Sequence, residues 1–332
     1  MEHSQDSNNE QPVGTGEWHG HYSVYGVTIC SNHPMPELPV DHDDEATSVY
    51  RVVSSRDGVK DVPGDEQQLT YRTTNLGIDL EVSESPDWYH LRWPEACEFH
   101  VSRDGRRVMG VVKNPRIEAS WLNSLFYGVV LSYVLHARGH LNLHAGALVT
   151  NSGVLGLLAE AGTGKSTLTA HLASTGLKFV TDDIIAPVES GSGYLVPPGF
   201  PYVSLTAESI NSVFGADAVP AGMKWNAPDT KERVHVDGEW GSFQETPVEL
   251  GNLVVLGRSD EGYSLRELDK REAVLALVQH SVALPLLPKE LIARHMAAAA
   301  KVVDQVPVWR LQVPPGLEHM SETVDMLRQK FA

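Results

Sequence analysis

Short runs in which hydrophobic and polar residues alternate fill the first third of the chain, a pattern typical of β-strands. The runs are Tyr22–Tyr25, Tyr50–Val53, Ile78–Val82, Tyr89–Trp93 and Val108–Val112. Turn-forming pairs separate them, namely Asp57-Gly58, Pro63-Gly64 and Asp104-Gly105. We therefore predict a β-rich domain over residues 17–117. The polar residues 1–16 before it are expected to form a disordered tail.

The hydrophobic period changes over residues 118–140. Between Trp121 and Val134, hydrophobic residues recur at steps of three and four, which predicts a helix with one apolar face. Arg138-Gly139 is a typical helix end. We expect this helix to link the β-rich domain to the rest of the chain.

Residues 141–332 have the order of elements that a nucleotide-binding α/β core requires. The pattern begins with two apolar strands, a glycine-rich segment, a helix and a third strand, at Leu141–Val149, Val154–Leu158, Ala159–Thr167, Ser166–Ser174 and Leu177–Thr181. Further strands are predicted at Leu253–Leu256 and Val308–Val313, and further helices at Glu272–Val282 and Lys289–Val303. The predicted fold class is α/β.

Composition narrows the classes of partner. The 332 residues are 42% hydrophobic, enough for a packed core, and carry a formal net charge of -17. So acidic a surface repels nucleic acids and anionic lipids, whereas a few local cations and backbone N–H groups can still hold a nucleotide. Cys30 and Cys97 lie far apart, without the spacing of a zinc site. With neither a signal peptide nor a long apolar run, we expect a cytoplasmic protein without membrane or nucleic-acid partners.

The glycine-rich segment carries the strongest chemical signal. It reads Ala-Glu-Ala-Gly-Thr-Gly-Lys-Ser from Ala159 to Ser166. Small residues let successive N–H groups point at phosphates, a lysine reaches the outer phosphates, and a serine hydroxyl can bind Mg²⁺. Ala159 stands where a glycine is usual, which is tolerable if its φ is negative. The residues expected to bind the nucleotide are Ala161, Gly162, Thr163, Gly164, Lys165, Ser166 and Thr167; the alternative is a glycine-rich turn without a ligand.

Two carboxylates follow the predicted third strand, at Asp182 and Asp183. Phosphoryl transfer to a hydroxyl uses one carboxylate to accept the proton and often another to hold Mg²⁺. Neighbouring residues on a strand point to opposite faces, so both reach one site only if the strand ends there, and Ile184-Ile185 argues against that ending. The alternative is a helix cap or a solvated acidic turn. His144, inside an apolar strand, would by itself be a structural core histidine.

Taken together, residues 141–188 resemble the core of the HPr kinase/phosphorylase family. The resemblance is carried by His144-Ala145-Gly146, the segment from Ala161 to Ser166, Gly176 and Thr181-Asp182-Asp183. It implies a phosphate-loop domain like that of phosphoenolpyruvate carboxykinase, and an ATP- and Mg²⁺-dependent kinase that acts on a serine hydroxyl. It further implies that Asp182 is the base and that His144 lies close enough to influence its protonation. Lys165 would act on the phosphates, while Asp183 and Ser166 would serve the metal.

Other segments resemble HPr-kinase-related proteins of biosynthetic gene clusters, some of which phosphorylate the C-terminal serine of a lasso-peptide precursor. These segments are Tyr25-Gly26-Val27, Pro34–Leu38, Pro198-Gly199-Phe200-Pro201 and Val306–Leu311. Members often carry a basic pair before a Pro-Val strand, here Lys231 and Arg233 before Pro247-Val248. These cations could brace the transferring phosphoryl group, or could belong to an exposed charged loop.

The glycine-rich signature that follows the active site in true HPr kinases is missing after Asp183, so regulation through HPr is not implied. Three functions remain. The first is a serine kinase for a ribosomally made, lasso-type precursor peptide. The second is a kinase for a small-molecule hydroxyl, and the third is a non-catalytic nucleotide-binding regulator. The family's closed rings imply a homo-oligomer.

Overall fold

The computed structural model describes residues 19–41, 47–54, 68–75, 78–191, 193–215, 222–223, 231–236, 238 and 240–332. The chain divides into two compact units at Val134 and Leu135, within the predicted linking helix. The second unit also includes two short N-terminal segments, Ser23–Val27 and Glu37–Pro39. The predicted tail and the turn pairs Asp57-Gly58 and Pro63-Gly64 lie outside the described residues.

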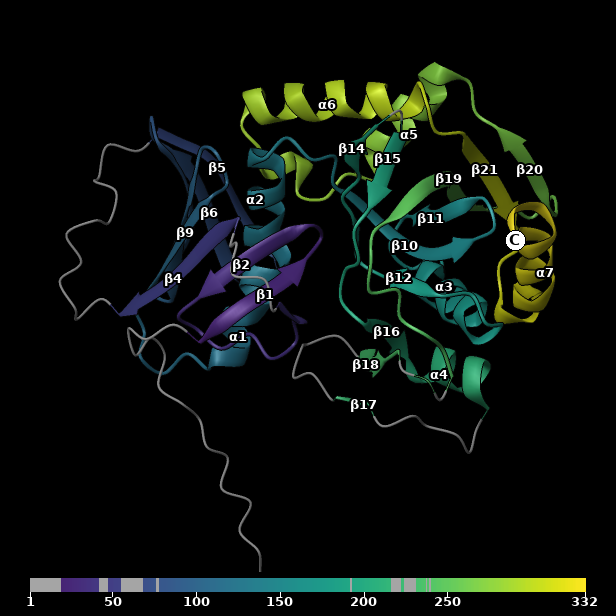
Figure 1. Cartoon of the computed structure of the whole chain (residues 1–332), viewed down its shortest axis with the longest axis horizontal. Coiled ribbons are helices and arrows are strands. Elements are labelled where there is room, and N and C mark those ends of the chain that lie inside the picture. Colours follow the sequence, from purple (N-terminus) through teal and green to yellow (C-terminus); the bar gives the residue numbers. More distant parts are fainter. Residues whose placement is uncertain are drawn as a thin grey trace, which may run out of the picture. The chain divides into compact units, whose positions relative to one another are not determined.

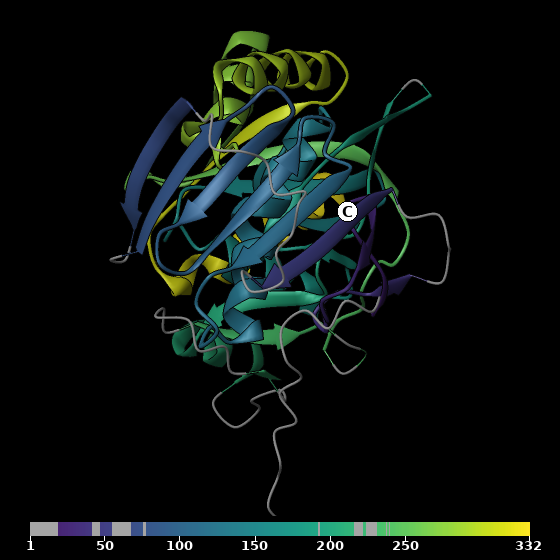
Figure 2. The same cartoon turned by 90° about the vertical axis from the view of Figure 1, so that its left-hand side faces the viewer.

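In the described part of the chain, the N-terminal region forms a sheet with the strand order β3-β1-β2-β4-β9-β8-β7-β6-β5 (Figures 1 and 2). The strands are β1 Gly20–Val24, β2 Val27–Ser31, β3 Val40–Asp41, β4 Ser48–Ser54, β5 Gln68–Asn75, β6 Ile78–Glu84, β7 Trp88–Trp93, β8 Cys97–Ser102 and β9 Arg107–Val112. The Asp104-Gly105 pair lies in the β8–β9 turn, where Gly105 has φ 68°. The five predicted runs overlap β1, β4, β6, β7 and β9, whereas β2, β3, β5 and β8 were not predicted.

The predicted linking helix is present in three consecutive pieces. These are α1 Ala119–Leu125, a π-helical turn at Phe126–Val130 and α2 Leu131–Ala137. The Phe126 ring stacks on Tyr50 of β4, with centroids 4.2 Å apart, so the apolar face of this segment covers the sheet of the first unit.

The second unit is built on a mixed sheet with the order β12-β10-β11-β19-β15-β14, to which β13, β20 and β21 are joined. Its strands are β10 Leu143–Thr150, β11 Gly153–Ala159, β12 Phe179–Thr181, β13 Ile184–Ile185, β14 Val188–Ser190, β15 Gly193–Val196, β19 Val248–Arg258, β20 Ser264–Glu267 and β21 Val308–Val313. Strand β19 runs parallel to both β11 and β21. A smaller sheet contains β16 Tyr202–Thr206, β18 Lys231–His235 and β17 Gly222–Met223, in that order.

Five α-helices of the second unit lie in the described residues. They are α3 Lys165–Ser174, α4 Ala207–Phe214, α5 Lys270–Gln279, α6 Lys289–Val303 and α7 Met320–Phe331, with short 3₁₀ turns at Leu284–Leu286 and Leu317–His319. Helix α6 has the predicted bounds. Helix α5 begins two residues before its predicted start, because Asp269 and Glu272 form a capping box there.

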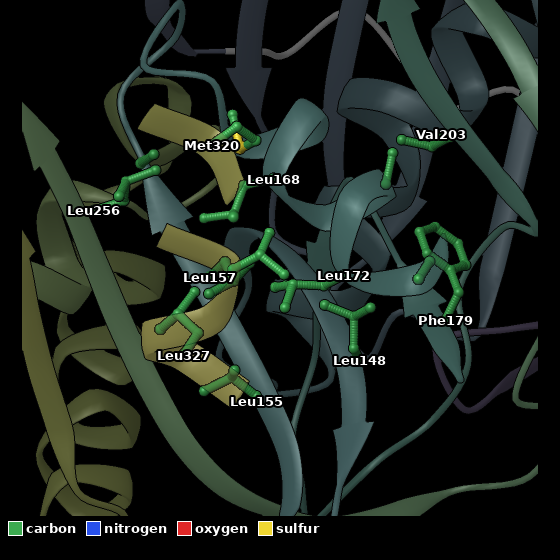
Figure 3. Close-up of a cluster of buried hydrophobic side chains, with 14 of the residues drawn as sticks. Leu148, Leu155, Leu157, Leu168, Leu172, Phe179, Val203, Leu256, Met320 and Leu327 are labelled. Carbon is green, nitrogen blue, oxygen red and sulfur yellow. The ribbon is translucent and has the colours of Figure 1, made fainter. Parts of the chain in front are cut away.

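The core beside the phosphate-loop candidate joins α3 to the sheet (Figure 3). Leu148 and Leu157 of the sheet pack with Leu168 and Leu172 of α3, and Leu327 of α7 belongs to the same cluster. Helix α3 approaches β10 so closely that a Cβ at Gly146 would lie 2.1 Å from the Thr169 hydroxyl. This packing fixes where the first residues of α3 stand. Among the described residues, no helix is long and apolar enough to cross a membrane.

Buried histidines pack together in the second unit. His136 and His295 have ring centroids 4.9 Å apart. Nε2–H of His136 donates to the Val282 backbone oxygen at 3.0 Å, and His295 is hydrogen-bonded to Ser281. Burial lowers the pKa of His136 to about 3 and that of His295 to about 4. Both rings are therefore neutral in the folded protein at neutral pH.

These histidines predict sensitivity to mild acid. In the unfolded chain these two histidines have a pKa near 6.5 and bind protons that they do not bind in the folded protein. Their contribution to the free energy of unfolding is therefore complete above pH 6.5 and is lost as the pH falls toward 4. One pH unit below 6.5, each group costs about 1.4 kcal/mol. For His136 and His295 together, the thermal midpoint should fall by roughly 5–10 °C between pH 7.5 and 5.5. Calorimetry of the His136→Asn, His295→Asn double variant should show a flatter pH dependence, whereas the exposed His19→Asn should not. An unchanged slope in the double variant would contradict this origin.

Candidate active site

The phosphate-loop candidate lies between β11 and α3. Gly162 and Gly164 have φ of 81° and 97°, the left-handed region that favours glycine. Ala159 is not among the described non-glycine residues with positive φ, so the condition that makes alanine tolerable there is met. Gly164 immediately precedes the first residue of α3, Lys165. The loop thus meets the N-terminal end of a helix, which favours anions.

An arginine that the sequence analysis missed holds this loop. Arg258, the last residue of β19, donates from Nη2 to the Thr163 backbone oxygen at 2.5 Å and from Nη1 to the Pro314 backbone oxygen at 2.8 Å. Burial lowers the pKa of this guanidinium. Arg258 lies far from the loop in sequence, and only the parallel pairing of β11 with β19 brings it there. In the sequence, Arg258 is marked only as a cation at the end of an apolar strand.

Both aspartates face one cavity because they lie between the end of one strand and the start of the next. Strand β12 ends at Thr181 and β13 begins at Ile184, so Asp182 and Asp183 lie in the gap. The Asp183 N–H donates to the Thr181 hydroxyl at 3.3 Å. Ile184-Ile185 does form a strand, but as a new pairing with Leu143 and His144 of β10. The two carboxylates can therefore act at the same site.

Lys165 and Asp182 form a buried ion pair. The Lys165 Nζ donates to the Asp182 backbone oxygen at 2.7 Å and to Oδ1 at 3.2 Å. The exposed fractions of the two side chains are 7% and 6%. The second carboxylate oxygen, Oδ2, accepts from the Ser204 N–H at 3.3 Å. The lysine of the loop thus contacts the first aspartate directly.

His144 pairs with the second aspartate, Asp183, whereas the family resemblance implied a place beside the first, Asp182. Its Nδ1–H donates to the Asp183 backbone oxygen at 3.0 Å, and Nδ1 lies 3.4 Å from Oδ1 of Asp183. The physical reason is the pairing of His144 with Ile184, which brings the ring beside the preceding residue. Desolvation raises the pKa of Asp183, but the hydrogen bond and charge of His144, with Lys165 and Arg233, outweigh it and hold that pKa below its usual range.

Two cavities meet at these residues. The first has a volume of ≈ 380 Å³ and is lined by Ala161, Gly162, Gly164, Lys165, Ser166 and Thr167 of the loop, together with Arg258 and the start of α4. Thr163 does not line it, since its carbonyl oxygen is bound by Arg258. The second has a volume of ≈ 280 Å³ and is lined by Asp182, Asp183, Phe200, Tyr202 and Arg233. His144, Ser166, Ser204 and Lys231 border both cavities.

The predicted basic pair is thereby divided between the two cavities. Lys231 and Arg233 stand two residues apart on β18, opposite Thr206 and Ser204 of β16. Lys231 reaches the loop cavity and its neighbour, whereas Arg233 lines only the second. The two cations lie on a strand at the site rather than in an exposed loop.

The donor atoms at the junction fit Mg²⁺ bound with phosphates. Ser166 contributes a hydroxyl and Asp183 a carboxylate that stays ionised, and both line the second cavity. Mg²⁺ commonly uses one or two such protein oxygens and takes its other ligands from phosphates and water. Within the described ranges, no group of three or more His, Cys, Asp or Glu side chains could hold a metal by itself.

Comparisons with known proteins give matches among solved structures and none by sequence. No protein-family model matches the sequence, and no curated protein matches it. The structure is similar in part to the HPr(Ser) kinase/phosphatase from Coxiella burnetii, with 16% sequence identity and a TM-score of 0.28. The match covers 57% of this chain and 95% of that one. A TM-score so low does not by itself establish a common fold.

The loop geometry generates a prediction. Replacing Gly164 with alanine would strain the φ of 97° and bring a Cβ to 2.8 Å from Nη2 of Arg258. We expect the dissociation constant of a fluorescent ATP analogue to rise at least tenfold, measured by titration. Gly262 also has φ 97° but has no atom within 4 Å of the added Cβ, so Gly262→Ala is the matched control and should bind normally. Equal binding by both variants would show that the loop does not hold phosphates.

Proposed function

We propose that this protein is an ATP-dependent phosphotransferase that moves the γ-phosphoryl group to a serine hydroxyl, on a ribosomally made peptide of the lasso-precursor type. The observation that carries the proposal is the Lys165–Asp182 ion pair at the meeting point of the two cavities. A residue suited to phosphates and a residue suited to accepting a proton are there within hydrogen-bond distance. A site for nucleotide binding alone has no need of the second.

In this proposal ATP lies in the loop cavity. The N–H groups of the loop residues that line this cavity, and the start of α3, face its phosphates, and Lys165 leaves Asp182 for the phosphate oxygens. Ser166 and Asp183 would hold Mg²⁺, which neutralises phosphate charge when bound. Lys231, which borders both cavities, supplies a further positive charge at the transferring group.

The transfer then needs one base. The acceptor hydroxyl oxygen forms a bond to the γ-phosphorus while the bond from that phosphorus to the β–γ bridging oxygen breaks, leaving ADP. The hydroxyl proton passes to the Asp182 carboxylate. Ser204 N–H keeps Asp182 in place after Lys165 has moved away. His144 favours the ionised form of Asp183, which suits a metal ligand better than a base.

The acceptor would occupy the second cavity, between Phe200, Tyr202 and Arg233. Its ≈ 280 Å³ lies just below the range of about 300–1,000 Å³ usual for small-molecule sites. Such a volume admits one amino-acid residue of a peptide, with the rest of the chain outside. The same volume favours a second candidate, a kinase for the hydroxyl of a small molecule.

The two candidates are separated by labelling. We expect synthetic peptides with a single serine, internal or C-terminal, to gain a phosphate in the presence of ATP and Mg²⁺, measured by mass spectrometry. Asp182→Asn should lower the transfer rate at least 100-fold, because the base is lost. It should leave ATP-analogue binding unchanged or tighter, because Lys165 loses a competing carboxylate. Asp260→Asn, an exposed aspartate outside both cavities, is the control and should transfer normally.

Other outcomes point elsewhere. Label on a small hydroxyl compound with none on peptides would support the small-molecule kinase. ATP-analogue binding with no turnover across a broad acceptor screen would support the non-catalytic regulator. Wild-type rates in Asp182→Asn would show that Asp182 is not the base.

A further inference from the structure

Two sequence motifs without a role in the chemistry meet in the second unit. They are Tyr25-Gly26-Val27, within the short N-terminal segment of that unit, and Pro198-Gly199-Phe200-Pro201. The Tyr25 N–H donates to the Pro198 backbone oxygen at 2.9 Å. The Tyr25 ring lies edge-on to that of Phe200, with centroids 5.8 Å apart. Phe200 is a wall of the second cavity.

Tyr25 is held in an unusual conformation. Its φ is 51°, a left-handed value that a bulky residue keeps only when its surroundings hold it, and such values cluster at functional sites. The following Gly26 has φ 76°, and a Cβ there would lie 2.9 Å from the Pro197 ring. The Tyr25 side chain is fully buried, and its hydroxyl lies beside Thr181 and Ile184 at the strand end. The ring is the part of Tyr25 that packs against the cavity wall at Phe200.

The Tyr25 ring also lies close to Thr181, the last residue of β12. A Cβ at Gly199 would lie 2.5 Å from a carbon of the Tyr25 ring and 2.5 Å from the Thr181 hydroxyl oxygen. The Gly199 N–H donates to the Val180 backbone oxygen at 3.0 Å. Thr181 is the last residue of β12 and its hydroxyl accepts from Asp183. Tyr25, Gly199 and Thr181 thus form one packed layer next to the aspartate pair.

The other aromatic wall also has an N-terminal neighbour. Burial and then the charge of Glu37 raise the pKa of Tyr202, so that carboxylate lies within electrostatic range of the ring. Glu37 belongs to the second N-terminal segment of this unit, Glu37–Pro39. One aromatic wall, Phe200, thus packs against a residue from the beginning of the chain, and the other, Tyr202, lies near a carboxylate from there.

We propose that Tyr25 is a positioning residue that fixes Phe200 as a wall of the acceptor cavity and fixes the strand end that carries Asp182 and Asp183. The proposal rests on the function proposed above for this cavity. Tyr25 and its contacts Pro198, Gly199 and Phe200 do not line the loop cavity, so nucleotide binding should not depend on them.

The experiment compares three variants of the full chain. Tyr25→Leu removes the ring, and Tyr25→Phe removes only the hydroxyl. Tyr50→Leu is the matched control, because Tyr50 is equally buried and lies in the first unit. The probes are an ATP analogue and the synthetic serine peptide that the wild-type protein labels most strongly. Hydrogen–deuterium exchange of residues 197–204 reports positioning without any activity.

For Tyr25→Leu we expect about tenfold faster exchange in residues 197–204 and about a tenfold higher KM for the peptide. ATP-analogue affinity should stay within twofold of wild type. Tyr25→Phe should keep the wild-type exchange rate and the wild-type KM for the peptide, and Tyr50→Leu should change neither quantity. Exchange and KM in Tyr25→Leu that match those of Tyr50→Leu would overturn the proposal.

The failure of the two proposals can be distinguished. If the wild-type protein labels no acceptor, the proposed function fails and so does the acceptor-binding half of this inference. The exchange rates then decide the positioning half. Faster exchange confined to Tyr25→Leu supports it, and equal exchange in the two leucine variants overturns it.

Discussion

The buried ion pair between Lys165 and Asp182 is the contact on which the rest of the site depends. It joins the first residue of α3 to the end of β12, and a third residue, Ser204 of β16, holds the same carboxylate. Removing one partner of a buried pair typically costs about 3–5 kcal/mol, because the other charge is left uncompensated. The pair therefore fixes the separation between the phosphate loop and the aspartates before any ligand arrives. In the proposed function, phosphates would compete with Asp182 for Lys165.

The two neighbouring carboxylates of the site have different partners. Asp182 is compensated by a lysine that can change partners, whereas Asp183 is compensated by a histidine fixed through its own backbone pairing. Adjacent residues in a broken strand thus receive different electrostatic environments. For Asp183, the histidine is among the groups that hold the pKa below its usual range.

Much of the second unit could be predicted because its signals are local. The apolar runs of β10 and β11, the glycines of the loop and the start of α3 lie within a few residues of one another. Ala159 could be judged from its expected φ alone. The strand break at Asp182-Asp183 could not be settled in this way, because Ile184-Ile185 does form a strand, with a different stretch of β10.

Long-range pairing accounts for the rest. Arg258 and the placement of Lys231 and Arg233 depend on strands that join the sheets far along the chain. The partner of His144 depended on register, because a shift of one position decides which aspartate the ring meets. The segments of Tyr25 and of Pro198–Phe200 were both singled out in the sequence, but their contact could not be predicted, since they lie more than 170 residues apart.

The hydrogen bonds that Arg258 donates to Thr163 and Pro314 make the glycine-rich motif dependent on distant parts of the chain. Residues 141–188 contain the whole glycine-rich loop and both aspartates, yet the loop carbonyl at Thr163 is held from β19, and the same guanidinium is anchored at Pro314 beyond β21. The motif is continuous in sequence while its support is spread almost to the end of the chain. A shortened chain that kept every recognisable motif would still lack the parts that hold the loop in its observed shape.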